Sequence, residues 1–151
     1  MTDSRRQRSG PQRTLTKALV VLIAALLLVG VLGYTPGGFA VQAAPMIVLL
    51  ALGPARRGWL RLSALAMFAF WLLIMVLIWL YLLGLANVIM WDLAPIEIVA
   101  TVVIGFASLA GIVAAVRATE PSRWSVRLAA FGVAFLLQVG AAWLSVQRFL
   151  C

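Results

Sequence analysis

Apolar residues fall into five runs along the chain, separated by short polar or breaker-rich segments. We expect helical segments over residues 18–34, 39–53, 62–84, 96–116 and 126–147. Four of these runs approach the roughly 20 residues that a helix needs to cross a bilayer core, and the second is shorter. The pattern predicts an all-α, polytopic integral membrane protein: a helical bundle of four long transmembrane helices plus one short or broken helix.

The second run is the least regular. Pro36, Gly37 and Gly38 stand before it, and Pro45 lies within it. A proline inside a helix removes the donor for the carbonyl four residues earlier, whereas a proline at a helix start is well tolerated. Irregular backbone at membrane depth has to be buried in protein or line a wet cavity. The sequence leaves open whether 39–53 spans the membrane or re-enters it.

The cations favour a return of the chain across the membrane at this segment. The sequence has 12 Lys and Arg. If 39–53 does not return the chain, they divide six against six between the two sides. If 18–34 and 39–53 form a hairpin, eleven lie on one side and only Arg148 on the other. Since cytoplasmic loops carry the excess of cations, we predict a cytoplasmic N-terminus and a C-terminus on the outer side.

Residues 1–17 are polar, basic and rich in helix breakers, so we predict a disordered cytoplasmic tail followed by a transmembrane bundle over 18–151. The triplet VQA before Ala44 resembles a signal-peptide cleavage site. Cleavage there would leave too short an apolar run to span, so we expect the segment to be retained. The alanine-rich and arginine-rich composition favours a bacterial inner membrane.

Composition excludes several classes of protein. Hydrophobic residues make up 65% of the chain and charged residues 11%, with a mean hydropathy of +1.12, so lipid has to be its solvent. The basic residues lie between apolar runs rather than along one face, which argues against nucleic acid as a partner. They also provide candidate anionic-lipid contacts at Arg56, Arg57 and Arg61.

Catalytic chemistry is poorly represented. Histidine is absent, and the single cysteine is Cys151, so an intramolecular disulfide and the usual Cys/His metal spacings are excluded. No catalytic triad, phosphate-binding glycine loop or zinc-protease motif is present. We therefore expect no enzyme activity, no cofactor and no metal.

A few polar residues are candidates for binding. Asp92 and Glu97 form a candidate outer acidic site, although a solvated Asp92 and a first-turn Glu97 are the simpler interpretation. Gln138 lies among alanines at four-residue spacing, which favours interhelical hydrogen bonding over substrate contact. A matching small-residue line at Ala107, Gly111 and Ala115 suggests that 96–116 packs against 126–147.

Two functions fit these features. The first is a non-catalytic accessory, assembly or stabilising subunit of a larger membrane complex, with lipid and other membrane subunits or further copies of itself as partners. The alternative is a small transporter or a membrane subunit of a secondary transport system, because discontinuous helices often form substrate sites. The candidate partner or substrate contacts are Pro36, Gly37, Gly38, Gln42, Pro45 and Gln138.

The eleven residues TPGGFAVQAAP loosely resemble the turn and following proline after the first helix of the small membrane subunit of tripartite tricarboxylate transporters. The spacing of the turn residues differs from that family's pattern. The resemblance implies a role in transport and adds to the second function only.

Overall fold

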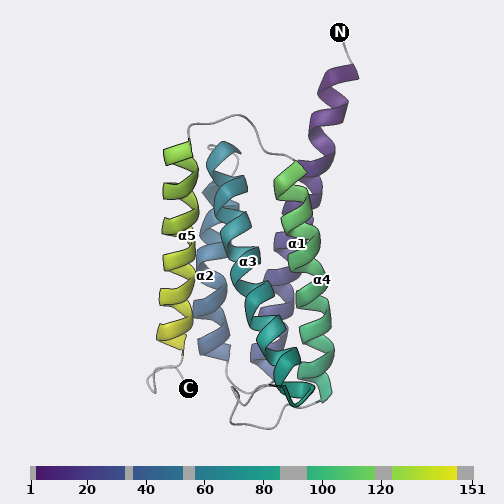
Figure 1. The fold of residues 1–151 in the computed structure, drawn as a ribbon, viewed down its shortest axis with the longest axis vertical. Helices are drawn as coiled ribbons and strands as arrows, with labels where there is room; N and C mark the ends of the chain where they lie inside the picture. The colour runs from purple at the N-terminus through teal and green to yellow at the C-terminus, as the bar shows by residue number, and fades with distance from the viewer. Residues whose placement is uncertain (1–2, 33–35, 53–56, 86–94, 118–123, 146–151) are drawn as a thin grey trace.

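The computed structural model describes residues 3–32, 36–52, 57–85, 95–117 and 124–145. This part of the chain holds five α-helices and no strand. The helices are α1 (Asp3–Leu32), α2 (Pro36–Leu52), α3 (Arg57–Leu82), α4 (Pro95–Arg117) and α5 (Trp124–Ser145). They run alternately up and down, so α1 begins at one end of the bundle and α5 ends at the other (Figure 1).

The predicted fold class is confirmed. α1, α3, α4 and α5 are each long and apolar enough to cross a membrane, and α2 is the one shorter apolar helix. α2 is not broken, however: its 17 residues form one helix with Pro45 inside it. It starts at Pro36, where a proline costs nothing because the first backbone N–H groups of a helix lack helical partners in any case. Gly37 and Gly38 therefore lie in the first turn of α2.

The prediction of a disordered tail over 1–17 is not met, because α1 is helical from Asp3 onward. The buried face of α1 begins inside this segment. Its almost fully buried residues recur every three or four positions: Leu15, Leu19, Leu22 and Leu26. An apolar stripe of this kind packs a helix against a core, and the Arg and Gln residues that precede it are good helix formers.

α3 contacts each of the other four helices, and most extensively α4 and α5. Around it, contacts join the remaining helices in the order α4, α1, α2, α5. In the part of the chain that the structure describes, α4 and α5 do not touch. The prediction that 96–116 packs against 126–147 is therefore wrong, because both helices pack on α3 instead.

A glycine of α4 and an aromatic residue of α5 pack against α3. A Cβ atom added at Gly111 would collide with the ring of Phe68 on α3, which is fully buried. On the other side, Phe70 of α3 meets Phe135 of α5 edge to face, with 5.9 Å between ring centroids. Small residues let helix backbones approach closely in lipid, and the bulky aromatic residues of α3 fill the space that they leave.

α3 ends at Leu82, close to the end of the segment predicted over 62–84, and Gly84 lies in the turn that follows. Its φ of 71° is in the left-handed region, which glycine adopts without steric cost. The Gly84 amide donates to the carbonyl of Tyr81, and the Leu85 amide donates to that of Leu80, each at 2.9 Å. These two bonds form a Schellman cap, which satisfies carbonyls that the end of a helix would otherwise leave unpaired.

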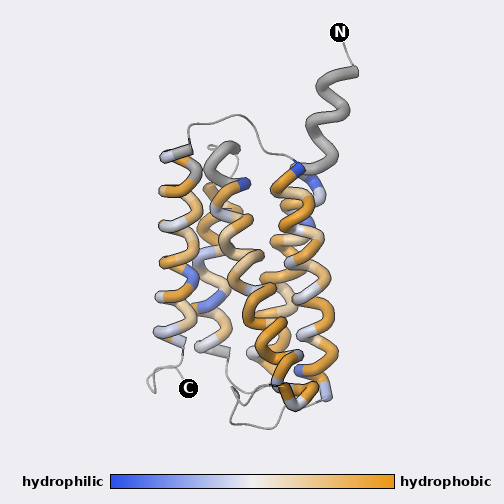
Figure 2. Tube along the Cα trace, viewed as in Figure 1, coloured by the Kyte–Doolittle hydropathy of each residue, from blue (hydrophilic) through white to orange (hydrophobic). Residues whose placement is uncertain are grey.

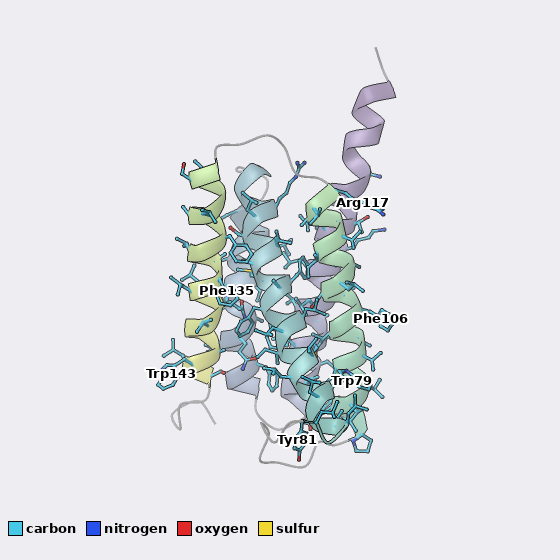
Figure 3. The ribbon with its side chains drawn as sticks, in the orientation of Figure 1. Trp79, Tyr81, Phe106, Arg117, Phe135 and Trp143 are labelled. Carbon is cyan, nitrogen blue, oxygen red and sulfur yellow. The ribbon has the colours of Figure 1, made fainter. Side chains whose placement is uncertain are left out.

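Hydrophobic residues predominate along the length of the helices (Figure 2). Large hydrophobic side chains are exposed on every helix, as a lipid-facing surface requires. Phe106 and Trp143 are 72% and 70% exposed and point away from the bundle, whereas Phe135 points inward (Figure 3). Arg117 lies at the end where α1 begins, and Trp79 and Tyr81 lie near the opposite end.

We expect Gly111→Ala to lower the stability of the protein by about 1–3 kcal/mol, because the added methyl group overpacks a core that cannot yield easily. The measurement is the free energy of unfolding of the purified protein in detergent. Gly105→Ala is the matched control, since no atom lies within 4 Å of its added Cβ and alanine is the better helix former. Equal losses from both substitutions would contradict the α3–α4 packing.

Candidate functional site

Side-chain hydrogen bonds join α2 to α5. The Nε2 of Gln138, a fully buried residue, donates to the backbone carbonyl of Gln42 at 3.1 Å. The Nε2 of Gln42 donates to the Oγ of Ser145 at 2.6 Å. The Ser145 hydroxyl donates to the carbonyl of Ala142 at 2.7 Å. Gln42, Gln138 and Ser145 therefore form one polar group inside an apolar bundle, which we call the α2–α5 network.

The α2–α5 network lies beside the turn of α2 in which Pro45 removes a backbone hydrogen bond. Pro45 has no amide hydrogen, so the carbonyl of Val41 lacks its helical donor. Lipid offers no replacement, and a proline inside a membrane helix therefore depends on groups from neighbouring helices. Gln138 supplies a donor to the next carbonyl, that of Gln42. The interhelical bond that the sequence favours for Gln138 is present, although it joins α5 to α2 rather than to α4.

The first turn of α2 comes close to the last turn of α5. A Cβ added at Gly38 would lie 3.2 Å from the carbonyl oxygen of Ser145, so the buried Gly38 allows an approach that a larger residue would hinder. Gly37 beside it is half-buried, and Pro45 is half-buried further along. Gly38 of the candidate contact set thus allows the close approach of α2 to α5.

A cavity of 300 Å³ is lined by residues from all five helices. Ligand sites in proteins occupy about 300–1,000 Å³, so its volume suits a small molecule. Most of its wall is aliphatic, with aromatic side chains at Phe39, Phe70 and Trp71. Phe70 and Trp71 pack edge to face, with 5.8 Å between ring centroids.

Three further polar side chains line this cavity: Gln42, Glu97 and Thr101. Glu97 and Thr101 are four residues apart on α4 and therefore share a face of the helix. The Thr101 hydroxyl donates to the carbonyl of Ile98 at 2.7 Å. Gln42 belongs to both the cavity and the α2–α5 network, so the cavity wall is linked directly to the bonds that hold α2.

Some buried polar atoms have no hydrogen-bond partner among the described residues. They include the Oε1 of Gln138, the Oγ of Ser108 and the Nε1 of Trp71. A buried polar group without a partner costs free energy, and such exceptions are uncommon in folded proteins. Trp71 is the one of these three residues that lines the cavity.

The residues of the predicted acidic and anionic-lipid sites are only partly described by the structure. Glu97 lines the cavity together with Gln42, whereas Asp92 falls outside the described residues. The structure describes Arg57 only as the first residue of α3, and Arg56 lies outside the described part. Arg61 is half-buried in the first turns of α3. The described residues hold no group of three His, Cys, Asp or Glu that could bind a metal ion.

Two cavity residues escape sequence reasoning. Thr101 is a single hydroxyl in an apolar run, and Trp71 is one of several aromatic residues in 62–84. Thr101 lies four residues after Glu97, so the two share one face of a helix. This spacing is a signal that could have paired Thr101 with Glu97. No local signal distinguishes Trp71 from an ordinary packing residue.

Among known protein families, curated proteins and solved structures, no match to this chain was found.

We expect Gln42→Leu and Ser145→Ala to be coupled, because each removes one partner of the same hydrogen bond. In a double-mutant cycle of unfolding free energies in detergent, the coupling should be about 0.6–1.7 kcal/mol, as for other interhelical bonds in membrane proteins. Ser108→Ala is the matched control, since its buried Oγ has no hydrogen-bond partner among the described residues. It should leave stability unchanged or raise it. Strictly additive losses in the cycle would contradict the bond.

Proposed function

We propose that this chain is a non-catalytic subunit of a larger bacterial inner-membrane complex, where it has an accessory, assembly or stabilising role. The observation that carries the proposal is the outer face of α5. Gly132, Leu136, Gly140 and Trp143 follow one another at spacings of four, four and three residues, which places them along one side of the helix.

This face has a shape suited to another helix. No atom lies within 4 Å of a Cβ added at Gly132 or Gly140, so both glycines border open space. Between and beside them, Leu136 and Trp143 are each 70% exposed. Alternating hollows and bulky side chains allow close contact between helices in lipid, where van der Waals packing drives association. Such a surface supports contact with another subunit or with a second copy of this chain.

A small transporter is the second candidate function, and the cavity is the observation that favours it. Transporter sites lie inside the bundle, near helices whose regular structure is interrupted. Here α2 carries Pro45 and contributes Phe39 and Gln42 to a cavity that all five helices line. A transport role would place the substrate next to α2, as the sequence-based alternative has it.

The charge distribution supports a cytoplasmic N-terminus. Thr14 of α1 and Arg117 of α4 line one hollow, so the start of α1 and the end of α4 share an end of the bundle. Arg13 and Lys17 flank Thr14 along α1, and α3 starts at this same end (Figure 1). An excess of cations at one end is the usual mark of the cytoplasmic side.

We expect the protein purified in mild detergent to carry a stoichiometric partner chain or a second copy, detected by native mass spectrometry. Gly140→Leu should release that partner, because the new side chain fills the hollow on α5. Gly105→Leu is the control: it also borders open space but lies on α4. A lone protomer in mild detergent, or equal release by both variants, would sink the proposal.

Cys151 reports the topology directly, because it is the only cysteine. We expect a membrane-impermeant maleimide to label it on intact cells stripped of their outer layers. In a Cys151→Ser background, Thr2→Cys should react only after the inner face is opened. Labelling of Cys151 only after opening would contradict an outer C-terminus.

A further inference from the structure

An open hollow of about 480 Å³ lies where the start of α1 meets the end of α4, and we call it the α1–α4 hollow. Its wall consists of Thr14 of α1 and six residues of α4, of which Phe106 is the first and Arg117 the last. These α4 residues share one side of the helix, because each has a neighbour in the wall three or four positions away. Phe106, Leu109 and Val113 are 72%, 49% and 40% exposed, so the hollow opens on the outer surface of the bundle.

The α1–α4 hollow has a polar end and an apolar body. Arg117 and Thr14 form the polar end, and Arg117 lies at the end of the bundle where α1 begins (Figure 3). The remaining wall residues are apolar: Phe106, Leu109, Ala110, Val113 and Ala114. Arg117 and Phe106 are eleven residues apart, which corresponds to about 16 Å along a helix. This length is close to half of the ~30 Å thickness of a bilayer core, the depth that one acyl chain covers.

Cations surround the polar end of the α1–α4 hollow. Lys17 lies four residues after Arg13 and three after Thr14, so both are its neighbours on the surface of α1. The side chains of Arg13, Lys17 and Arg117 are all exposed. Glu97, the only acid whose side chain the structure describes, is twenty residues from Arg117 along α4, or about 30 Å. At that distance its charge is largely screened from the three cations.

The whole of this end of the bundle carries an excess of positive charge. The segments that begin α1, lead from α2 into α3, and lead from α4 into α5 contain eleven Lys or Arg and two acids, Asp3 and Glu120. The excess therefore persists when these acids are counted. Negatively charged lipids are attracted to such an end, and the cytoplasmic leaflet is the one with a negative surface potential. The proposed orientation places the α1–α4 hollow in that leaflet.

We propose that the α1–α4 hollow binds an anionic phospholipid of the cytoplasmic leaflet, with its phosphate at Arg117 and Lys17 and one acyl chain along α4 toward Phe106. Cationic side chains form charge-assisted hydrogen bonds with phosphate oxygens, and the apolar stripe of α4 receives the chain. A zwitterionic lipid has the same chains, but its ammonium group offsets the phosphate charge. The hollow shares no lining residue with the central cavity, and the assignment holds for a subunit and for a transporter.

The test uses the full chain purified in mild detergent, with phosphatidylglycerol and phosphatidylcholine of identical acyl chains as probes. Native mass spectrometry measures the affinity for each lipid. We expect saturable binding of phosphatidylglycerol that Arg117→Gln weakens by about fivefold, the factor that one cation near an anionic surface supplies. The same substitution should leave the weaker binding of phosphatidylcholine unchanged. Equal affinities of the wild-type protein for the two lipids would overturn the proposal.

Arg127→Gln is the matched control for charge. It removes one cation from the same end of the bundle, on α5, which among the described residues contacts neither α1 nor α4 (Figure 1). This variant should bind phosphatidylglycerol as the wild type does, and equal losses in Arg117→Gln and Arg127→Gln would refute a defined site. Lys17→Gln approaches the same phosphate from α1 and should also weaken binding, so the result does not depend on one variant.

A second pair of variants tests the apolar body of the hollow. Ala110→Phe fills the hollow and should weaken binding of phosphatidylglycerol, whereas Ala129→Phe adds the same ring at an exposed position of α5 and should not. Glycerol phosphate carries the phosphate without acyl chains and should not displace the lipid at matched ionic strength. Displacement by glycerol phosphate, or equal effects of the two phenylalanine substitutions, would refute a lipid as the occupant.

Discussion

The hydrogen bonds between α2 and α5 are the interaction on which the arrangement of this bundle depends. A membrane helix has to satisfy its backbone polar groups without water, and Pro45 disturbs that requirement in the middle of α2. Gln138 donates to the carbonyl of Gln42, which is next to the carbonyl that Pro45 leaves without a helical donor, and the side chain of Gln42 donates to Ser145. Both bonds join α2 to a helix about a hundred residues later in the chain, with sequence separations of 96 and 103. With α5 held beside α2, a 17-residue helix keeps its place among longer ones.

The position of α5 constrains the other helices. Because α5 occupies the side of α2, α4 packs on the far side of α3 and closes the bundle against α1. α3 then has to meet neighbours on several sides, and its large side chains do so: Phe68 fits over Gly111, and Phe70 meets Phe135. Where the five helices do not fill the space between them, a cavity remains whose wall includes Gln42 of the α2–α5 network. The structural network and the candidate site are therefore one continuous region of the protein.

The polar residues of this protein are few, and their distribution separates two kinds of surface. Outside, exposed Phe106 and Trp143 and the glycines of α5 face lipid or another helix. Inside, Glu97 and Thr101 face a space of molecular size. A subunit of a complex needs an exposed outer face for contact with its partner, and a ligand-binding protein needs an internal cavity. The two roles are compatible, because the outer face of α5 and the cavity wall do not share residues.

The sequence by itself determined the class of the protein, the number of helices and the approximate bounds of the last four, because run length and breakers are local properties of the chain. It missed the start of α1, which is helical from Asp3 onward. It also singled out Gln42, Glu97 and Gln138, since polar residues in apolar runs are conspicuous. It could not decide which helices touch. Small-residue spacing predicted contact between α4 and α5, but such spacing fits any neighbour, and α3 takes that place. Only the tertiary structure brought Gln42 and Glu97 to one cavity, because their meeting depends on how five similar helices pack rather than on any residue near them in the chain.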